Sequence, residues 1–297
     1  MKKMKRYDSS KGKGLIYIFG ETIFSNLIIV LLIYLTNSFE LTYLLKVALI
    51  IVNIYEAYYI LLYISVNYTM NEKSLNINII RDLVIDKILI DDIQCYSRKT
   101  GKINGIKISG HGKDSFALGK SIIDKIGLTR MYVTSSKDVI YLKTKDTTYG
   151  ISPQDGDKFE KFLEGKGVEN STWEYLPNKN IHLHNNKRYF IPFVISTILI
   201  IVLTLNPFIK YLKGSLPAKM PISFDPSFNP ISFGTGKQFA FKQMVYGVLN
   251  MIVLLCMYYA SYFYAKYDKR SAYKYIYISL GITMFFLIMQ FKILNTF

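Results

Sequence analysis

The chain has 297 residues, 51% of them hydrophobic, and its 37 Lys and Arg against 21 Asp and Glu give a net charge of +16. Five apolar runs hold more than a third of this length, and each is long enough for a helix to cross about 30 Å of hydrocarbon. A wholly water-soluble protein is therefore excluded, and the sequence predicts a multi-span membrane protein with one folded domain on one side of the bilayer. The runs are 15–36, 43–68, 190–209, 241–264 and 271–291.

Residues 1–14 are a basic tail that sets the predicted orientation. The tail holds six basic residues and one acid, and short segments rich in Lys and Arg stay on the cytoplasmic side of a membrane. With five spans, the tail and the polar insert 69–189 share one side, which we predict to be the cytoplasm, and the C-terminus lies outside. The tail cations could also bind anionic lipid at about 1 kcal/mol each. These candidates are Lys2, Lys3, Lys5 and Arg6.

Four of the polar residues in the predicted transmembrane hairpin, 15–68, lie within its two spans and form one candidate cluster. They are functional candidates because a carboxylate inside the membrane is costly unless it is paired or hydrated. At about 1.5 Å per residue, Asn26 and Glu56 lie at one depth and could hydrogen-bond across the hairpin. A proton or ligand path is one interpretation. Polar contacts between the spans are favoured, since no opposite charge is near. The four are Glu21, Asn26, Asn53 and Glu56.

The insert changes to short β-type segments separated by turn residues, which predicts a folded domain over 69–168. Short strands at this spacing are typical of an antiparallel sandwich or barrel. We interpret Gly110-His111-Gly112-Lys113 as a flexible turn, because a phosphate-binding loop would need a strand-to-helix setting and a following hydroxyl. The predicted strands are 74–80, 83–90, 103–109, 130–134, 138–144 and 147–151.

One helix is predicted to end this domain. Ser152 is placed to cap it, Pro153 suits its first turn, and nearby acidic residues favour its positive end. Three apolar residues then recur on one helical face, and a glycine can stop the helix. The helix would close one open end of a barrel. The residues after the cap are Asp155, Asp157, Phe159, Phe162 and Leu163, with Gly165 or Gly167 as the stop.

The closing half of the domain resembles that of bacterial PH domains. It contains Arg130-Met-Tyr-Val-Thr, then Asp138-Val-Ile-Tyr-Leu-Lys-Thr, then Tyr149-Gly-Ile-Ser-Pro-Gln-Asp before the helix. This is the family's order of two strands, an I-S-P-x-D turn and a terminal helix, and Leu89-Ile90-Asp91-Asp92-Ile93 is similar to an earlier family strand. The resemblance covers about 70–165. It implies an all-β, PH-like barrel with one C-terminal helix, but not phosphoinositide binding.

The juxtamembrane linker, 169–189, holds the only Trp of the chain and two of its His residues. Trp173 and Tyr175 could settle at the lipid headgroups or pack on the domain. His182 and His184 could present two metal ligands on one face, but a metal site needs a third or fourth ligand that the sequence does not offer. We therefore predict no metal site and no cofactor.

The C-terminal membrane domain, 190–297, carries three spans and a Pro-rich outer loop at 210–240. Its Pro and Gly residues exclude a regular helix and predict an ordered loop that turns back. The loop resembles the L-P-x-x-I-P loop of a membrane module found in immunity proteins against the sporulation-delay toxin. Ser223 stands where that module has His, so the resemblance implies the loop's shape and place only. The candidate loop residues are Pro217, Pro221, Asp225, Asn229, Pro230 and Lys237.

Catalytic motifs are absent from the sequence, including H-E-x-x-H, G-x-S-x-G and a Gly-Lys-Ser/Thr phosphate loop. We expect no enzymatic activity, and no nucleic-acid binding because topology explains the charge. The sequence predicts a cell-membrane regulator, sensor or immunity-type protein whose PH-like domain docks a protein partner or a second copy. A transporter or channel component that uses the intramembrane polar residues is the alternative.

Overall fold

The computed structural model describes residues 5–36, 38–80, 83–174, 182–225, 228–267 and 269–297. The chain divides into two compact units. The first contains Met1–Ile28 with Leu49–Pro177, and the second contains Ile29–Ala48 with Asn178–Phe297. Each unit is described by itself.

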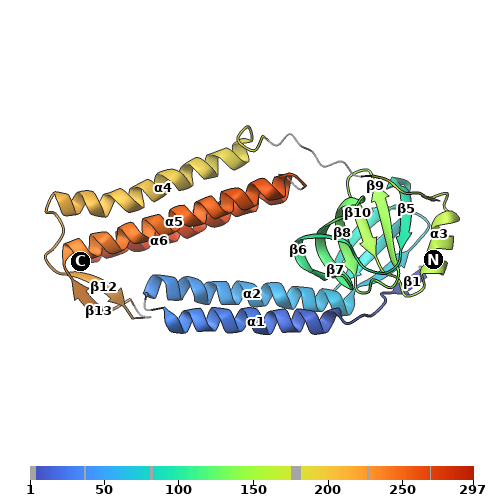
Figure 1. The fold of residues 1–297 in the computed structure, drawn as a ribbon, viewed down its shortest axis with the longest axis horizontal. Coiled ribbons are helices and arrows are strands. Elements are labelled where there is room, and N and C mark those ends of the chain that lie inside the picture. The colour runs from blue at the N-terminus through green and yellow to red at the C-terminus, as the bar shows by residue number, and fades with distance from the viewer. Residues whose placement is uncertain (1–4, 37, 81–82, 175–181, 226–227, 268) are drawn as a thin grey trace. The chain divides into compact units, whose positions relative to one another are not determined.

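Among the described residues, five helices are long and apolar enough to cross a membrane (Figure 1). All five predicted spans are therefore present as helices, with ends displaced by a few residues. Most of their apolar side chains point outward, and only 6% of the apolar stretch of the first helix is buried by protein. Lipid is the solvent that such a surface requires. The helices are α1 (Gly14–Leu35), α2 (Phe39–Ser65), α4 (Lys187–Leu212), α5 (Gly236–Ala265) and α6 (Lys269–Thr296).

The first unit contains a mostly β domain made of two sheets. An antiparallel four-stranded sheet has the order β1-β2-β3-β4, and a seven-stranded sheet has the order β11-β5-β9-β10-β8-β7-β6. The strands of the first sheet are β1 (Lys5–Asp8), β2 (Asn67–Met70), β3 (Ser74–Ile79) and β4 (Val84–Leu89). Those of the second are β5 (Ile93–Lys99), β6 (Gly105–Lys113), β7 (Phe116–Ile123), β8 (Gly127–Val133), β9 (Val139–Thr144), β10 (Thr148–Ile151) and β11 (Glu169–Asn170).

The two sheets share one apolar core. Tyr68 of β2 is fully buried, and its hydroxyl donates to the carbonyl of Tyr132 at 2.7 Å while accepting from the Ser152 amide at 3.1 Å. Burial raises the pKa of the Tyr68 phenol to about 12, although the bond from Ser152 opposes the rise. One phenol thus joins β2 to the opposite sheet.

The terminal helix α3 (Gly156–Glu164) packs Phe159 and Leu163 into this core. Its N-cap is Asp155, whose side chain accepts from the Lys158 amide at 3.1 Å, so the prediction that Ser152 caps the helix is wrong. The N-terminal segment explains the difference, because it pairs with 152–154 through Ser10 N to Ser152 O and Gln154 N to Asp8 O, at 2.8 and 2.9 Å. This pairing keeps Ser152 and Pro153 extended.

The predicted turn at 110–113 is also wrong, since these residues lie inside strand β6. Gly110 and Gly119 face each other on β6 and β7 with φ of +92° and +104°, a region that favours glycine. A Cβ at Gly110 would meet the Leu118 carbonyl, so the two strands approach closely there. The glycines therefore mark a close strand contact, and the actual turn follows at Asp114 and Ser115.

The second unit packs α4, α5 and α6 with a short antiparallel hairpin, β12 (Met220–Phe224) and β13 (Pro230–Gly234). This hairpin is the ordered returning loop that the sequence predicts. Polar side chains join the buried helix faces, as Gln290 donates to the Leu203 carbonyl at 2.8 Å and Thr283 to Asn250 at 3.2 Å. Such bonds are the usual polar contacts between membrane helices.

Candidate functional site

A buried histidine joins the β domain to both spans of the hairpin. His111 of β6 is 4% exposed, and its Nδ1 lies 2.6 Å from Oε2 of Glu21 on α1. Its Nε2 lies 3.1 Å from Oε2 of Glu56 on α2, outside hydrogen-bond geometry. The Thr22 hydroxyl donates to the same Glu56 oxygen at 3.1 Å. We call Glu21, Glu56 and His111 the junction triad.

Tyrosines of α2 support the junction triad. The Tyr55 hydroxyl accepts from the Gly110 amide at 2.8 Å, beside the histidine, and the Tyr59 ring centre lies 5.1 Å from the His111 ring. One helical turn further, the Tyr63 hydroxyl accepts from the Gly12 amide at 3.1 Å and donates to the Gly12 carbonyl at 2.7 Å. The last three turns of α2 are therefore bonded to the domain and to the segment before α1.

The four predicted intramembrane residues divide into two pairs with different partners. Asn26 and Asn53 bond to each other, at 2.8 and 3.2 Å, instead of Asn26 bonding to Glu56. Glu21 and Glu56 meet at His111, so the assumption that no group able to carry positive charge is near them is wrong. A buried carboxylate is stabilised when such a partner is present. This contact was not predicted because residues 56 and 111 are far apart in the sequence.

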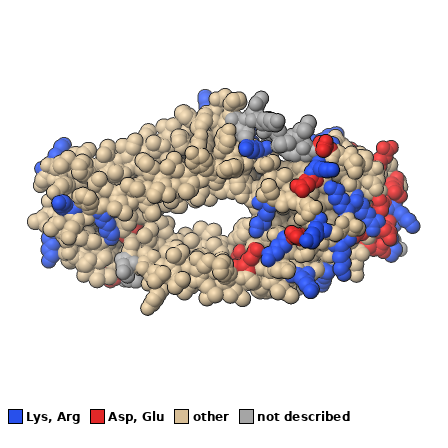
Figure 2. All heavy atoms as spheres, in the orientation of Figure 1, with Lys and Arg blue, Asp and Glu red and all other residues tan. Residues whose placement is uncertain are grey.

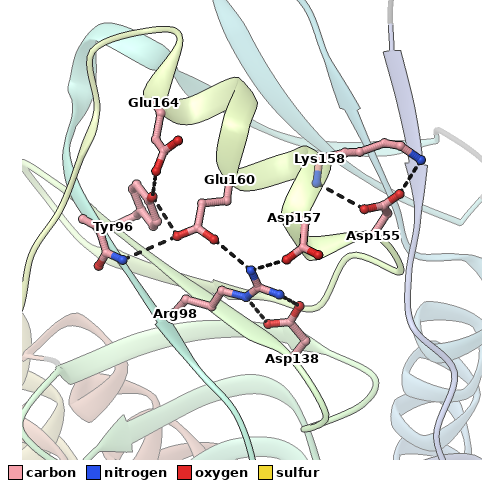
Figure 3. Close-up of polar contacts among 9 residues, drawn as sticks. Tyr96, Arg98, Asp138, Asp155, Asp157, Lys158, Glu160 and Glu164 are labelled. Carbon is pink, nitrogen blue, oxygen red and sulfur yellow. Dashed lines mark hydrogen bonds and ion pairs between the residues drawn. The ribbon is translucent and has the colours of Figure 1, made fainter.

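A second polar network fixes α3 to the sheet (Figure 3). The Arg98 guanidinium binds Asp138 through two bonds of 2.7 Å and also contacts Asp157 at 2.6 Å and Glu160 at 2.8 Å. Hydrogen bonds to these carboxylates, Asp138 first, raise the pKa of the Arg98 guanidinium. The Tyr96 hydroxyl donates to Glu160 at 2.9 Å, and burial raises its pKa. This network has a structural role, because it holds α3 against the sheet.

The outer-loop candidates surround the β12–β13 hairpin. Asp225 accepts from the backbone amide of Asn229 at 2.7 Å and from its side chain at 3.0 Å, which closes the hairpin turn. Pro221 lies in β12, Pro230 begins β13, Pro217 precedes the hairpin and Lys237 lies in the first turn of α5. These residues therefore shape the loop.

A carboxylate missed by the sequence reasoning lies in the same unit as the outer loop. Glu40, at the start of α2, is 2% exposed and accepts from the Tyr246 hydroxyl at 3.0 Å and from Ser38 at 2.7 Å. A cavity of about 360 Å³ lies beside it, lined on one side by Phe39 and on the other by Phe224. Glu40 could have been identified in the sequence as a carboxylate placed among apolar residues.

The remaining candidates lie apart from the junction triad. Lys5 and Arg6 belong to β1, and Lys2 and Lys3 lie outside the described residues, as does Tyr175. Trp173 packs on the domain, where its Nε1 donates to the Ile126 carbonyl at 3.3 Å. His184 contacts the Tyr258 hydroxyl at 3.2 Å, and His182 is exposed. Within the described ranges, no group of three or more His, Cys, Asp and Glu could hold a metal ion.

Comparison with known proteins identifies residues 66–167 as a bacterial PH domain, which confirms the predicted resemblance. The chain is also 38% identical to an uncharacterised protein of Clostridium acetobutylicum over 289 residues, which are 97% of each chain. No solved structure matches it significantly. The chain belongs to the family of that clostridial protein. In this chain, helices able to span a membrane lie before and after the bacterial PH domain.

Proposed function

We propose that this protein is a non-enzymatic membrane regulator or sensor whose PH domain docks a protein partner or a second copy. The two sheets would form the walls of a PH-type barrel, with α3 at one end. The domain and the N-terminus would face the cytoplasm and the C-terminus the outside, because the basic residues near the spans are concentrated on the domain side. The observation that carries the proposal is the junction triad.

The junction triad supports a sensor because it makes the domain respond to the spans. His111 contacts one carboxylate on each span, so a shift of α1 against α2 changes both distances at once. Tyr55 and Tyr63 transmit the same shift to backbone groups of the domain and of the segment before α1. A docking surface on the domain can therefore be coupled to events in the membrane without a catalytic step.

Docking is tested by isolating the intact protein from its native membrane in polymer-bounded discs that keep the surrounding lipid. We expect a second copy or one other protein to be recovered in a fixed ratio, as measured by light scattering and quantitative mass spectrometry. A variant with His182→Ala, which alters an exposed residue, should recover the same partner. Recovery of the lone monomer from native membranes would overturn the docking proposal.

A transporter or channel component is the second candidate, and the burial of Glu56 within a span favours it. In that case Glu56→Gln would abolish ion or solute flux in proteoliposomes while the amount of folded protein is unchanged. Glu169→Gln, the same chemical change at an exposed position of β11, would be the matched control. Unchanged flux, or loss of folded protein in place of flux, would exclude this candidate.

A further inference from the structure

A groove of about 660 Å³ between β1 and α3 is lined mainly by cations. Lys5 and Arg6 come from β1, and three lysines come from α3 and the turn after it, while Tyr7 and Phe162 give the groove two aromatic surfaces. Among the described residues, no acidic side chain lines the groove. The three lysines are Lys158, Lys161 and Lys166. We call these five cations and two aromatic residues the basic groove.

The charge of the basic groove is largely unneutralised. Arg6 faces Asp8 at 3.5 Å and Lys158 binds Asp155 at 2.5 Å. For Lys5, Lys161 and Lys166 the described part of the chain provides no ion pair. The reason lies on the other side of α3, where Arg98 and Tyr96 engage the helix carboxylates (Figure 3). The acidic residues of the helix are thus occupied by the sheet, and its lysines remain available to a ligand.

We infer that the basic groove binds an acidic segment of a partner protein. This inference rests on the proposed docking function. Cations on both walls require a ligand with several separated negative charges, and the aromatic surfaces suit apolar side chains between them. A chain of net charge +16 favours such a partner electrostatically.

A lipid surface suits the basic groove less well, because in the described part of the chain no residue of a spanning helix lines it. A neighbouring cavity of about 830 Å³ does include Ile64 and Ser65 at the end of α2, and it shares Arg6 with the groove. In the first unit, α3 lies at the end of the domain away from the domain-side ends of α1 and α2 (Figure 1). Figure 2 shows charged side chains gathered over this domain, whereas the long helices are mostly uncharged.

The test uses the full chain in discs of phosphatidylcholine and a fluorescent decamer of glutamate, with a glutamine decamer as the neutral probe. We expect the acidic peptide alone to bind, more weakly at high salt. Substituting Lys158→Glu, Lys161→Glu and Lys166→Glu together should weaken binding about tenfold or more. The control substitutes three exposed lysines elsewhere on the domain, Lys87→Glu, Lys107→Glu and Lys137→Glu, and has the same net charge.

Trp173, the only Trp, reports whether each variant keeps its folded domain. If the triple substitution unfolds the domain, Lys161→Gln with Lys166→Gln is measured in its place, and the same loss of binding is expected. Equal loss in the control, or no binding to wild type, would overturn the inference. So would displacement of the peptide by the soluble headgroup glycerophosphoglycerol at matched ionic strength, because the groove would then be a lipid site. Partner recovery from native membranes is a separate measurement. Failure of the docking proposal can therefore be distinguished from failure of the inference about the basic groove.

Discussion

At the scale of single residues, His111 is the side chain of the PH domain that contacts a carboxylate on each of α1 and α2. It is buried between two carboxylates that belong to different helices, and each of them loses its shared partner if the imidazole is removed. Loss of a buried polar partner costs about 1–3 kcal/mol. The sequence predicted both carboxylates as candidates but not the histidine, because only the approach of β6 to the hairpin brings residue 111 to them.

We predict that His111→Ala lowers the unfolding free energy of the first unit by about 1–3 kcal/mol. Amide exchange in the segment that contains Glu21 should also become faster, since α1 loses its bond to the domain. Thermal melts followed through Trp173, with hydrogen exchange by mass spectrometry, measure both effects. His182→Ala should change neither, and identical melts for wild type and His111→Ala would contradict the role of the junction triad.

Tyr68 makes a second prediction at this scale. Tyr68→Phe keeps the ring in the core but removes the hydroxyl from the Tyr132 carbonyl and the Ser152 amide, which then lie buried without that partner. The free energy of unfolding should fall by about 1–3 kcal/mol. Tyr34→Phe, at a residue that is 84% exposed, is the control and should leave the denaturant midpoint unchanged. Equal midpoints for all three proteins would show that the phenol does not join the sheets.

At the scale of elements, local pattern predicted much of the fold. The five apolar helices, the order of strands from residue 127 to 151 and the stop of α3 near Gly165 were all visible as periodicity and turn residues. Strands β1, β2, β5, β7 and β11 of the first unit were not predicted. The N-terminal strand β1 is the clearest example, because Lys5–Asp8 has no apolar alternation and becomes a strand only by pairing with β2.

The attachment of α3 gives a prediction at the element scale. Arg98→Met leaves Asp138, Asp157 and Glu160 clustered without their cation, so the domain should lose about 3 kcal/mol of stability and release α3. Arg98→Lys keeps the charge but not the two-pronged contact and should lie between wild type and Arg98→Met. Chemical denaturation and exchange of the α3 amides measure this.

The control for Arg98 is a looser ion pair on the same domain. Lys102 lies 3.6 Å from Asp114, and both side chains are mostly exposed. Lys102→Met should therefore cost at most about 0.5 kcal/mol. If Arg98→Met and Lys102→Met have equal stability, the Arg98 network does not hold the helix.

At the scale of the whole molecule, the PH domain is inserted between the second and third spanning helices. A domain inserted between two such helices is tethered at both ends, and its basic groove carries charge that is largely unneutralised. Composition and hydropathy were sufficient to predict this arrangement, because a spanning helix needs only length and apolarity. The groove could not be predicted, since Lys5 and Lys161 are distant in sequence and meet through the pairing of β1.

The central claim is that five helices cross the bilayer, with the PH domain on one side and the C-terminal outer hairpin on the other. It is tested by a membrane-impermeant maleimide on intact cells, after Cys95 and Cys256 are replaced by Ser. A cysteine in place of Lys219, beside the outer hairpin, should be labelled directly. One in place of Lys137, on the PH domain, should react only after permeabilisation. Labelling of both positions from the same side would contradict the account.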